Sequence, residues 1–248
     1  MPARAIFLSA VVLTIAADKP VKDSKNELDK PQSDLTWVED IVLRPHFVLQ
    51  ESETGTRRWT VAPKLTVVGG TRDQQKLVAE VVEHLNETLK QTPLKGIELL
   101  GPNNPAATLP VFFVHKHAIP KKATELGQPR KVAQVMTKEK WNCACWIRED
   151  SAKKCEIQSG VVLVSSDKAD ADQLRNNLLT TLCYDLGLMS FSTLRPTSVF
   201  YRDGDKRNRV EKLTTKDQQL IIWFYNYVPA GTVSVKQLYQ DHWRKAIP

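Results

Sequence analysis

Three histidines are the first candidates for metal chemistry in this sequence. His115 and His117 stand two residues apart, so on a strand both imidazoles would lie on one face, and His84 falls in a predicted helix. Imidazole nitrogen is a common zinc ligand. A metal site formed by His84, His115 and His117 is therefore one hypothesis. The alternative, which the flanking lysines favour, is a strand that ends in solvent with two exposed imidazoles.

Four cysteines offer a second kind of chemistry. Cys143 and Cys145 flank one alanine, and Cys155 follows after a plausible turn between two strands. A disulfide from Cys143 or Cys145 to Cys155 would join the two strands of a hairpin, provided that the chain is exported to an oxidising compartment. Zinc binding needs two Cys-x-x-Cys pairs, which this spacing does not provide. Cys183 falls in a helical pattern, which favours a buried thiol.

Other catalytic motifs are absent from the sequence. It has no Gly-x-Ser-x-Gly turn to expose a nucleophilic serine and no glycine-rich loop to hold phosphates. We therefore assign no catalytic residue and expect no cofactor.

Strands and helices alternate along the chain that must position these residues. An alternating pattern predicts a strand over 58–68, and a Thr71–Gln74 capping box begins a helix that reaches about Leu89. Further strands are expected over 97–100, 109–115, 141–148 and 157–165. Leucines at every fourth position predict a helix over 174–186 that ends at Gly187. Two more helices are expected, over 213–227 and from Ser234 onward. The pattern indicates an α+β fold, with a mixed β-sheet packed on helices.

The helix that ends at Gly187 and two segments after it resemble a known family. Leu182–Leu188 is followed by Ser198-Val199-Phe200-Tyr201, and then by a helix with Leu213, Asp217, Ile221 and Tyr225 at four-residue intervals. This order resembles the C-terminal half of the metzincin zinc peptidases. There a His-Glu-x-x-His-x-x-Gly-x-x-His helix precedes a Ser-Ile-Met-Tyr-like Met-turn and a Leu-Ser-x-x-Asp helix. The resemblance implies a zincin-like fold with a Met-turn-like segment over 198–201.

The catalytic positions of that family are all replaced in this chain. Alignment on Gly187 places Thr180, Tyr184 and Ser190 at the three histidines and Thr181 at the glutamate. Hydroxyl groups are weak zinc ligands near neutral pH, and a threonine cannot accept the proton of a zinc-bound water. The resemblance therefore implies a degenerate active-site helix, and we favour a pseudo-peptidase over an enzyme.

A closer resemblance is to a bacterial family of exported or lipid-anchored proteins of unknown function, which itself looks like a degenerate zincin. It covers about residues 57 to 240. The matching features are Arg58-Trp59, the Leu-Gly-Leu helix end, Pro196–Phe200, the Leu-Thr-x-x-Asp helix start and Pro229-Ala230-Gly231. In that family acidic residues and Gln tend to fill the former zinc positions, and a Cys lies where this chain has Asn177.

The N-terminus has the pattern of a secretory signal peptide over residues 1–17. Arg4 precedes an apolar run that is too short to span a bilayer and that ends in two alanines suited to cleavage. No cysteine follows to take a lipid, so we expect a secreted or periplasmic protein without a transmembrane segment after cleavage. A retained signal anchor is the alternative. Residues 18–34 should form a flexible linker, and 35–248 a single zincin-like domain.

Positive charge is concentrated in one polar segment. The chain has 248 residues, 42% hydrophobic and 25% charged, with a formal net charge of +7. This composition excludes wholesale disorder and coiled coil. We expect a loop over residues 118–140, and the segment 116–140 contains seven basic and two acidic residues. The basic residues are Lys116, Lys121, Lys122, Arg130, Lys131, Lys138 and Lys140. A solvated loop is one interpretation, and a site for an anionic polymer is the other. Nucleic acid is disfavoured because no aromatic residues interleave with the charges.

Three functions are consistent with these patterns. The leading hypothesis is a secreted, non-catalytic zincin-like domain that binds a protein or an anionic polymer of the cell envelope. The second is a hydrolase with a relocated metal site or relocated chemistry. The third is a purely structural component of the envelope.

Overall fold

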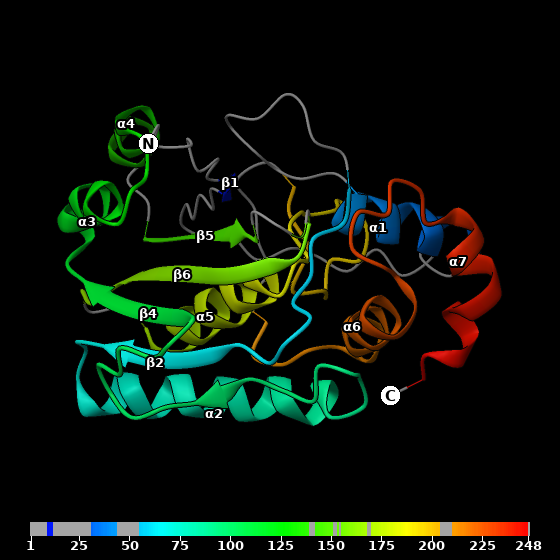
Figure 1. Cartoon of the computed structure of the whole chain (residues 1–248), viewed down its shortest axis with the longest axis horizontal. Helices are drawn as coiled ribbons and strands as arrows, with labels where there is room; N and C mark the ends of the chain where they lie inside the picture. The colour runs from blue at the N-terminus through cyan, green and yellow to red at the C-terminus, as the bar shows by residue number, and fades with distance from the viewer. Residues whose placement is uncertain are drawn as a thin grey trace.

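A mixed β-sheet forms the centre of the molecule, described here from a computed structural model (Figure 1). The structure describes residues 9–11, 31–43, 55–138, 142–150, 153, 155–167, 170–203 and 210–247. The strands lie in the order β1-β5-β6-β4-β2-β3. Their bounds are β1 Ser9–Val11, β2 Lys64–Val68, β3 Glu98–Leu99, β4 Leu109–Val114, β5 Cys143–Glu149 and β6 Ile157–Ser165. The strands β3, β2, β4 and β6 are parallel, whereas β5 is antiparallel to β6 and β1 is antiparallel to β5.

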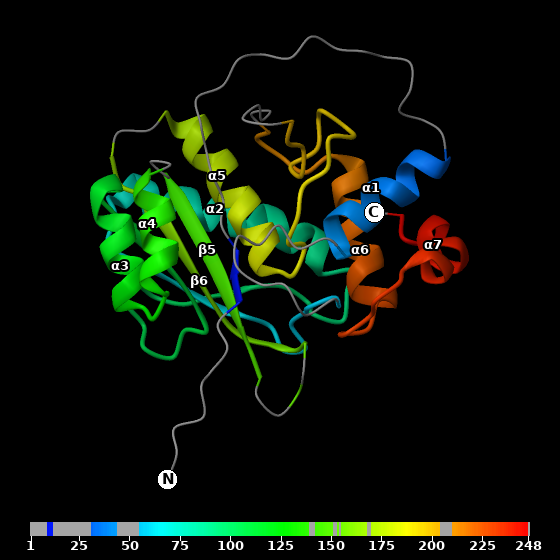
Figure 2. The same cartoon turned by 90° about the horizontal axis from the view of Figure 1, so that it is seen from above.

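Helices cover both faces of this sheet (Figures 1 and 2). Their bounds are α1 Pro31–Leu43, α2 Arg72–Leu89, α3 Ile119–Glu125, α4 Arg130–Lys138, α5 Ala171–Asp185, α6 Thr215–Tyr227 and α7 Lys236–His242. The helices α2 and α5 lie on one face, and α3 and α4 lie on the other, while α1, α6 and α7 gather at one end. None of the helices in the described ranges combines the length and apolarity that a bilayer crossing requires.

Alternating residues of β5 and β6 fill two separate cores. Cys145 and Val162 belong to the large core beneath α2, α5 and α6, whereas Trp146 and Leu163 belong to a smaller core beneath α3 and α4. Successive side chains of a strand point to opposite faces, so strands covered on both sides are apolar throughout. The predicted mixed sheet packed with helices is therefore confirmed, and its four parallel strands make the fold a mixed α/β one.

The helix α5 is buried on nearly all sides. From Leu174 to Asp185 every residue except Arg175 is buried, as expected for a helix inside a core. Its C-terminus has a Schellman motif at Gly187, whose φ is +95°. The N–H of Gly187 donates to the carbonyl of Tyr184 (2.8 Å), and that of Leu188 donates to the carbonyl of Cys183 (3.3 Å). The predicted helix end is confirmed, and burial raises the pKa of the Cys183 thiol well above its usual value.

The predicted hairpin of β5 and β6 is confirmed, but the predicted disulfide across it is wrong. All four cysteine side chains are buried, and no disulfide joins them. Cys155 lies just before Ile157, which pairs with Glu149 at the far end of β5. Glu149 lies four positions after Cys145, about 13 Å along the strand, and Cys143 lies farther still. A disulfide needs Cα atoms within about 7 Å, so this register keeps Cys155 away from both partners.

Two segments that the sequence patterns describe as irregular are helical. The predicted linker over 18–34 is wrong at its end, because α1 begins at Pro31 and buries Trp37 and Ile41. Residues 18–30 lie outside the described ranges. The predicted loop over 118–140 contains α3 and α4, whose buried pairs Ile119 with Ala123 and Val132 with Met136 are each four residues apart. This spacing fits one face of a short helix.

Candidate functional site

The residues that align with the zinc-binding positions of the metzincins lie inside the core. Thr180 and Ser190 are 3% exposed, and Thr181 and Tyr184 are fully buried. The Thr181 hydroxyl donates to the carbonyl of Asn177 (2.6 Å), one turn earlier in α5. Tyr184 packs edge to face against Phe191, with ring centroids 5.0 Å apart. These four side chains therefore serve the packing of α5.

Zinc does not fit these residues. A catalytic zinc needs three nitrogen or carboxylate ligands and an open position for water. Here the aligned groups are three hydroxyls and a phenol, and burial denies them solvent. Within the described ranges, no group of three or more His, Cys, Asp and Glu side chains could hold a metal ion. We derive no metal-dependent step for this chain.

Hydrogen bonds to Asp217 hold the Met-turn-like segment 198–201 against α6. The Ser198 hydroxyl donates to Oδ1 of Asp217 (2.5 Å), and the Val199 N–H donates to Oδ2 (3.3 Å). Asp217 also accepts from the N–H and hydroxyl of Thr214, which completes a capping box. Burial raises the pKa of Asp217, and these hydrogen bonds oppose the rise. Phe200, at the position of the family's methionine, is fully buried. Its ring packs edge to face on Trp37, and Tyr201 is 7% exposed. The segment is thus structural.

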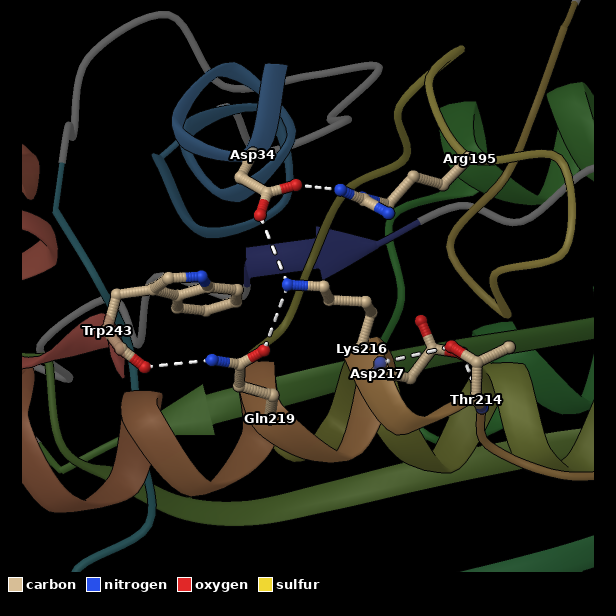
Figure 3. A network of polar contacts seen from close by, with 7 residues as sticks. All are labelled: Asp34, Arg195, Thr214, Lys216, Asp217, Gln219 and Trp243. Carbon is tan, nitrogen blue, oxygen red and sulfur yellow. Dashed lines mark hydrogen bonds and ion pairs between the residues drawn. The ribbon is translucent and has the colours of Figure 1, made fainter. Parts of the chain in front are cut away.

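A polar network joins α1 to α6 beside this segment (Figure 3). Asp34 of α1 forms ion pairs with Arg195 and with Nζ of Lys216 (3.2 Å). Lys216 also donates to Gln219, whose amide donates to the carbonyl of Trp243 (2.8 Å). The network fastens α1 and the C-terminal segment onto α6, and its charges are paired with each other.

The three histidines do not form the predicted site. His84 on α2 accepts the N–H of Leu213 (3.0 Å), while His115 lies 2.9 Å from Oδ1 of Asp167. His117 is exposed in a 3₁₀ turn over Lys116–Ala118. His115 lies exposed just after the end of β4, in agreement with the alternative prediction of a strand that ends in solvent.

A polar cleft of about 220 Å³ opens at the carboxyl ends of β4 and β6. It is lined by Lys116, Asn142, Val164, Ser165, Asp167, Gln173, Leu174 and Asn177. The sequence patterns single out none of its amide side chains as site residues. Such residues are common in solvated loops, and only the fold brings them together. The α5 residues that line the cleft are Gln173, Leu174 and Asn177, and Asn177 lies one turn before Thr181.

The predicted basic segment forms an exposed surface on α3 and α4. Lys121, Arg130 and Lys131 are exposed, while Lys122 lies 3.3 Å from Glu125. A shallow groove of about 290 Å³ runs between the two helices and is lined in part by Lys121 and Arg130. The side chain of Lys138 and the whole of Lys140 lie outside the described residues.

The outer side of β5 is paired with the short N-terminal strand β1 of the same chain. Ser9, Ala10 and Val11 of β1 pair antiparallel with Ile147, Trp146 and Cys145. The rest of the predicted signal peptide lies outside the described residues. Sequence patterns did not predict this pairing, because an apolar run is equally typical of a signal peptide.

Comparison with known proteins places the chain in a family. The family model "Protein of unknown function (DUF2927)" matches residues 39–230. The chain belongs to this family. The prediction that this chain belongs to a family of unknown function is thus confirmed. Its export is still a prediction.

Other comparisons are weaker. No curated protein gives a significant match to the DUF2927 chain. Two solved structures of myroilysin match with TM-scores of 0.36. One is 10% identical and covers 68% of this chain and 95% of its own, and the other is 11% identical and covers 81% and 98%. The function therefore has to be argued from the chain's own geometry.

Proposed function

We propose that this chain is a non-catalytic, zincin-like domain that binds an extended segment of an envelope protein by adding it as a strand to β5. The observation that carries the proposal is the antiparallel pairing of β1 with β5. A segment of the chain's own N-terminus thus shows how a strand can occupy this edge.

Strand addition follows from the chemistry of a sheet edge. An edge strand presents backbone N–H and C=O groups that pair with any extended segment of matching register. β5 has seven residues, and its inner side is held by β6 in an antiparallel ladder. Both of its faces are packed, by α5 on one side and by α3 and α4 on the other. The edge is therefore held rigid before a partner arrives, which lowers the entropic cost of binding.

The predicted signal peptide links this edge to export. Cleavage after Ala16 or Ala17 would remove β1 and leave the outer side of β5 without a strand. The mature protein would then present this edge only after secretion. Burial of the former zinc positions supports a binding role over peptide hydrolysis, because no water or substrate reaches them.

A peptide of residues 5–15, with two added lysines for solubility, tests the proposal. We expect it to bind the chain that lacks residues 1–17 and to slow hydrogen exchange at the amides of β5. The amides of β3, at the opposite edge of the sheet, should exchange as before. The full-length chain should bind the peptide more weakly, since its own β1 competes. The proposal fails if β5 gains no protection, or if a peptide N-methylated at alternate residues protects it equally.

Binding of an anionic envelope polymer is a second candidate, favoured by the basic groove between α3 and α4. Polyphosphate should bind in a salt-sensitive manner, because surface charges are screened within about 10 Å at 0.1 M salt. Replacing Lys121, Arg130 and Lys131 together by Gln should remove this binding. Replacing the exposed Lys236 of α7 should leave it unchanged. Equal binding by the triple variant would reject this second candidate.

A further inference from the structure

The cleft at the carboxyl ends of β4 and β6 is separate from the β5 edge and from the basic groove. Parallel strands β4 and β6 end side by side at Val114 and Ser165. In open sheets with helices on both faces, ligands commonly bind beyond the carboxyl ends of the strands. The cleft volume of about 220 Å³ lies below the roughly 300–1,000 Å³ of pockets for drug-sized molecules. Its ligand is therefore small.

Asn177 is the strongest sign that the cleft takes a ligand. This side chain is 3% exposed, and its Oδ1 has no hydrogen-bond partner. Buried carboxamides nearly always have partners, because an unpaired polar group in a core costs free energy. Asn177 lines the cleft, so a donor group of a bound molecule would satisfy this oxygen.

Three further polar side chains around the cleft can form hydrogen bonds with a ligand. The amides of Asn142 and Gln173 and the ammonium of Lys116 have no hydrogen-bond partner among the described residues. Carboxamides both donate and accept hydrogen bonds. A ligand that carries several groups able to do the same, such as hydroxyls, matches this set.

The charges of the cleft favour an uncharged ligand. Lys116 contributes one positive charge and Asp167 one negative charge. The Asp167 carboxylate is already held by His115 (2.9 Å) and by the backbone N–H of Lys116 (3.1 Å). A ligand with a full charge would gain from one of the two groups and be repelled by the other.

Two apolar side chains complete the lining. Val164 is 1% exposed and Leu174 is 6% exposed, and both contribute to the wall of the cleft. The ligand should therefore be amphipathic, with a C–H face for this wall and a polar rim for the amides.

We propose that this cleft binds a single pyranose unit of a carbohydrate. A pyranose has a C–H face, a rim of hydroxyls that donate and accept, and no charge. In the bound state one hydroxyl donates to Oδ1 of Asn177, and others meet the amides of Asn142 and Gln173.

Ligand-observed NMR on the full-length chain tests this proposal with D-glucose and N-acetyl-D-glucosamine as probes. Acetate, followed by saturation transfer, and inorganic phosphate, followed by the width of its phosphorus line, serve as charged comparisons. We expect saturation transfer to at least one of the sugars, none to acetate, and no broadening of the phosphate line. The Asn177→Leu substitution should weaken sugar binding at least tenfold. It should not lower the melting temperature, because it removes an unpaired polar group. Gln134→Leu, which replaces an exposed amide on α4, should bind the sugar as the unaltered chain does.

Gln173→Leu provides a second test that does not depend on a core position, and it should also weaken binding. The proposal is overturned if neither sugar receives saturation, or if both Asn177→Leu and Gln173→Leu bind the sugar like the unaltered chain. Binding of acetate or phosphate without sugar binding would also overturn it, and would indicate an anion site at Lys116.

Discussion

The buried carboxyl of Asp185 should make this protein less stable as pH rises above the usual pKa of an aspartic acid. Asp185 ends α5 and is 1% exposed, and neither carboxylate oxygen has a hydrogen-bond partner. A Cβ atom added to Gly160 on β6 would lie only 3.4 Å from this carboxyl, so the group packs closely against the sheet. Desolvation raises the pKa of Asp185 well above its usual value.

The sign of the effect follows from proton binding. The unfolded chain releases the Asp185 proton near pH 3.9, whereas the folded chain keeps it until the higher, folded pKa. Between these two pKa values the folded state binds more protons, so the free energy of unfolding falls as pH rises. The loss is about 1.4 kcal/mol per pH unit inside this window. For a chain of this length, 1.4 kcal/mol corresponds to roughly 3–6 °C in melting temperature. Below the window this cost is absent, and above it the cost is constant.

Asp185→Asn keeps the shape of the side chain and removes the titration. Urea unfolding, followed by tryptophan fluorescence from pH 4 to pH 8, measures the difference between the variant and the unaltered chain. Other titrating groups cancel in this difference. We expect no gain near pH 4 and a gain for Asp185→Asn that grows steadily as pH rises through the window. A difference that does not change with pH, or a less stable variant at neutral pH, would refute the argument.

Two further predictions concern the ends of α5 and α6. Gly187→Ala should lower the free energy of unfolding by about 2–5 kcal/mol in urea, because φ at this residue is +95° and a Cβ would collide with the Arg57 carbonyl. The control Gly101→Ala should cost almost nothing, since no atom lies within 4 Å of its added Cβ. Equal effects of the two substitutions would contradict this explanation. Asp217→Ala should lower the free energy of unfolding by about 2–4 kcal/mol, since it removes a helix cap and the hydrogen bond to Ser198 in the Met-turn-like segment. A double-mutant cycle with Ser198→Ala should show coupling, and strictly additive effects would mean that the Ser198–Asp217 hydrogen bond contributes nothing.

Elements with a strong local signal could be predicted from the sequence. The capping boxes at Thr71 and Thr214 and the helix end at Gly187 are local, because each depends on residues within a few positions of the terminus. The β5–β6 hairpin is predictable for the same reason. The helices α3 and α4 are too short for a long apolar stripe, and their charges suggested a loop. The helix α1 is buried at Trp37 only through contacts with distant segments, such as the ring of Phe200.

The candidate site depended on tertiary contacts that no local pattern contains. Asn177 and Asp185 are single polar residues in an apolar helix, and sequence patterns cannot tell whether such a residue faces solvent, a cavity or the core. The alignment with the peptidase family falls on α5 and on the segment 198–201. It directed attention to Thr180 and Tyr184, which pack in the core, and away from Asn177, one turn earlier.

Asn177 and Asp185 of α5 both have buried oxygens without a hydrogen-bond partner, but they differ in what they can do. Asp185 packs against the sheet at the closed end of the helix, where the structure places no cavity among those described, so its cost to stability is not recovered by a ligand. Asn177 lines a cleft, so a donor group of a bound molecule would satisfy its unpaired oxygen. Asn177 therefore offers a buried acceptor at the wall of the cleft, three residues before Thr180 in α5. Gln173 of α5 lines the same cleft, so Asn177→Leu and Gln173→Leu together test whether this helix takes part in binding.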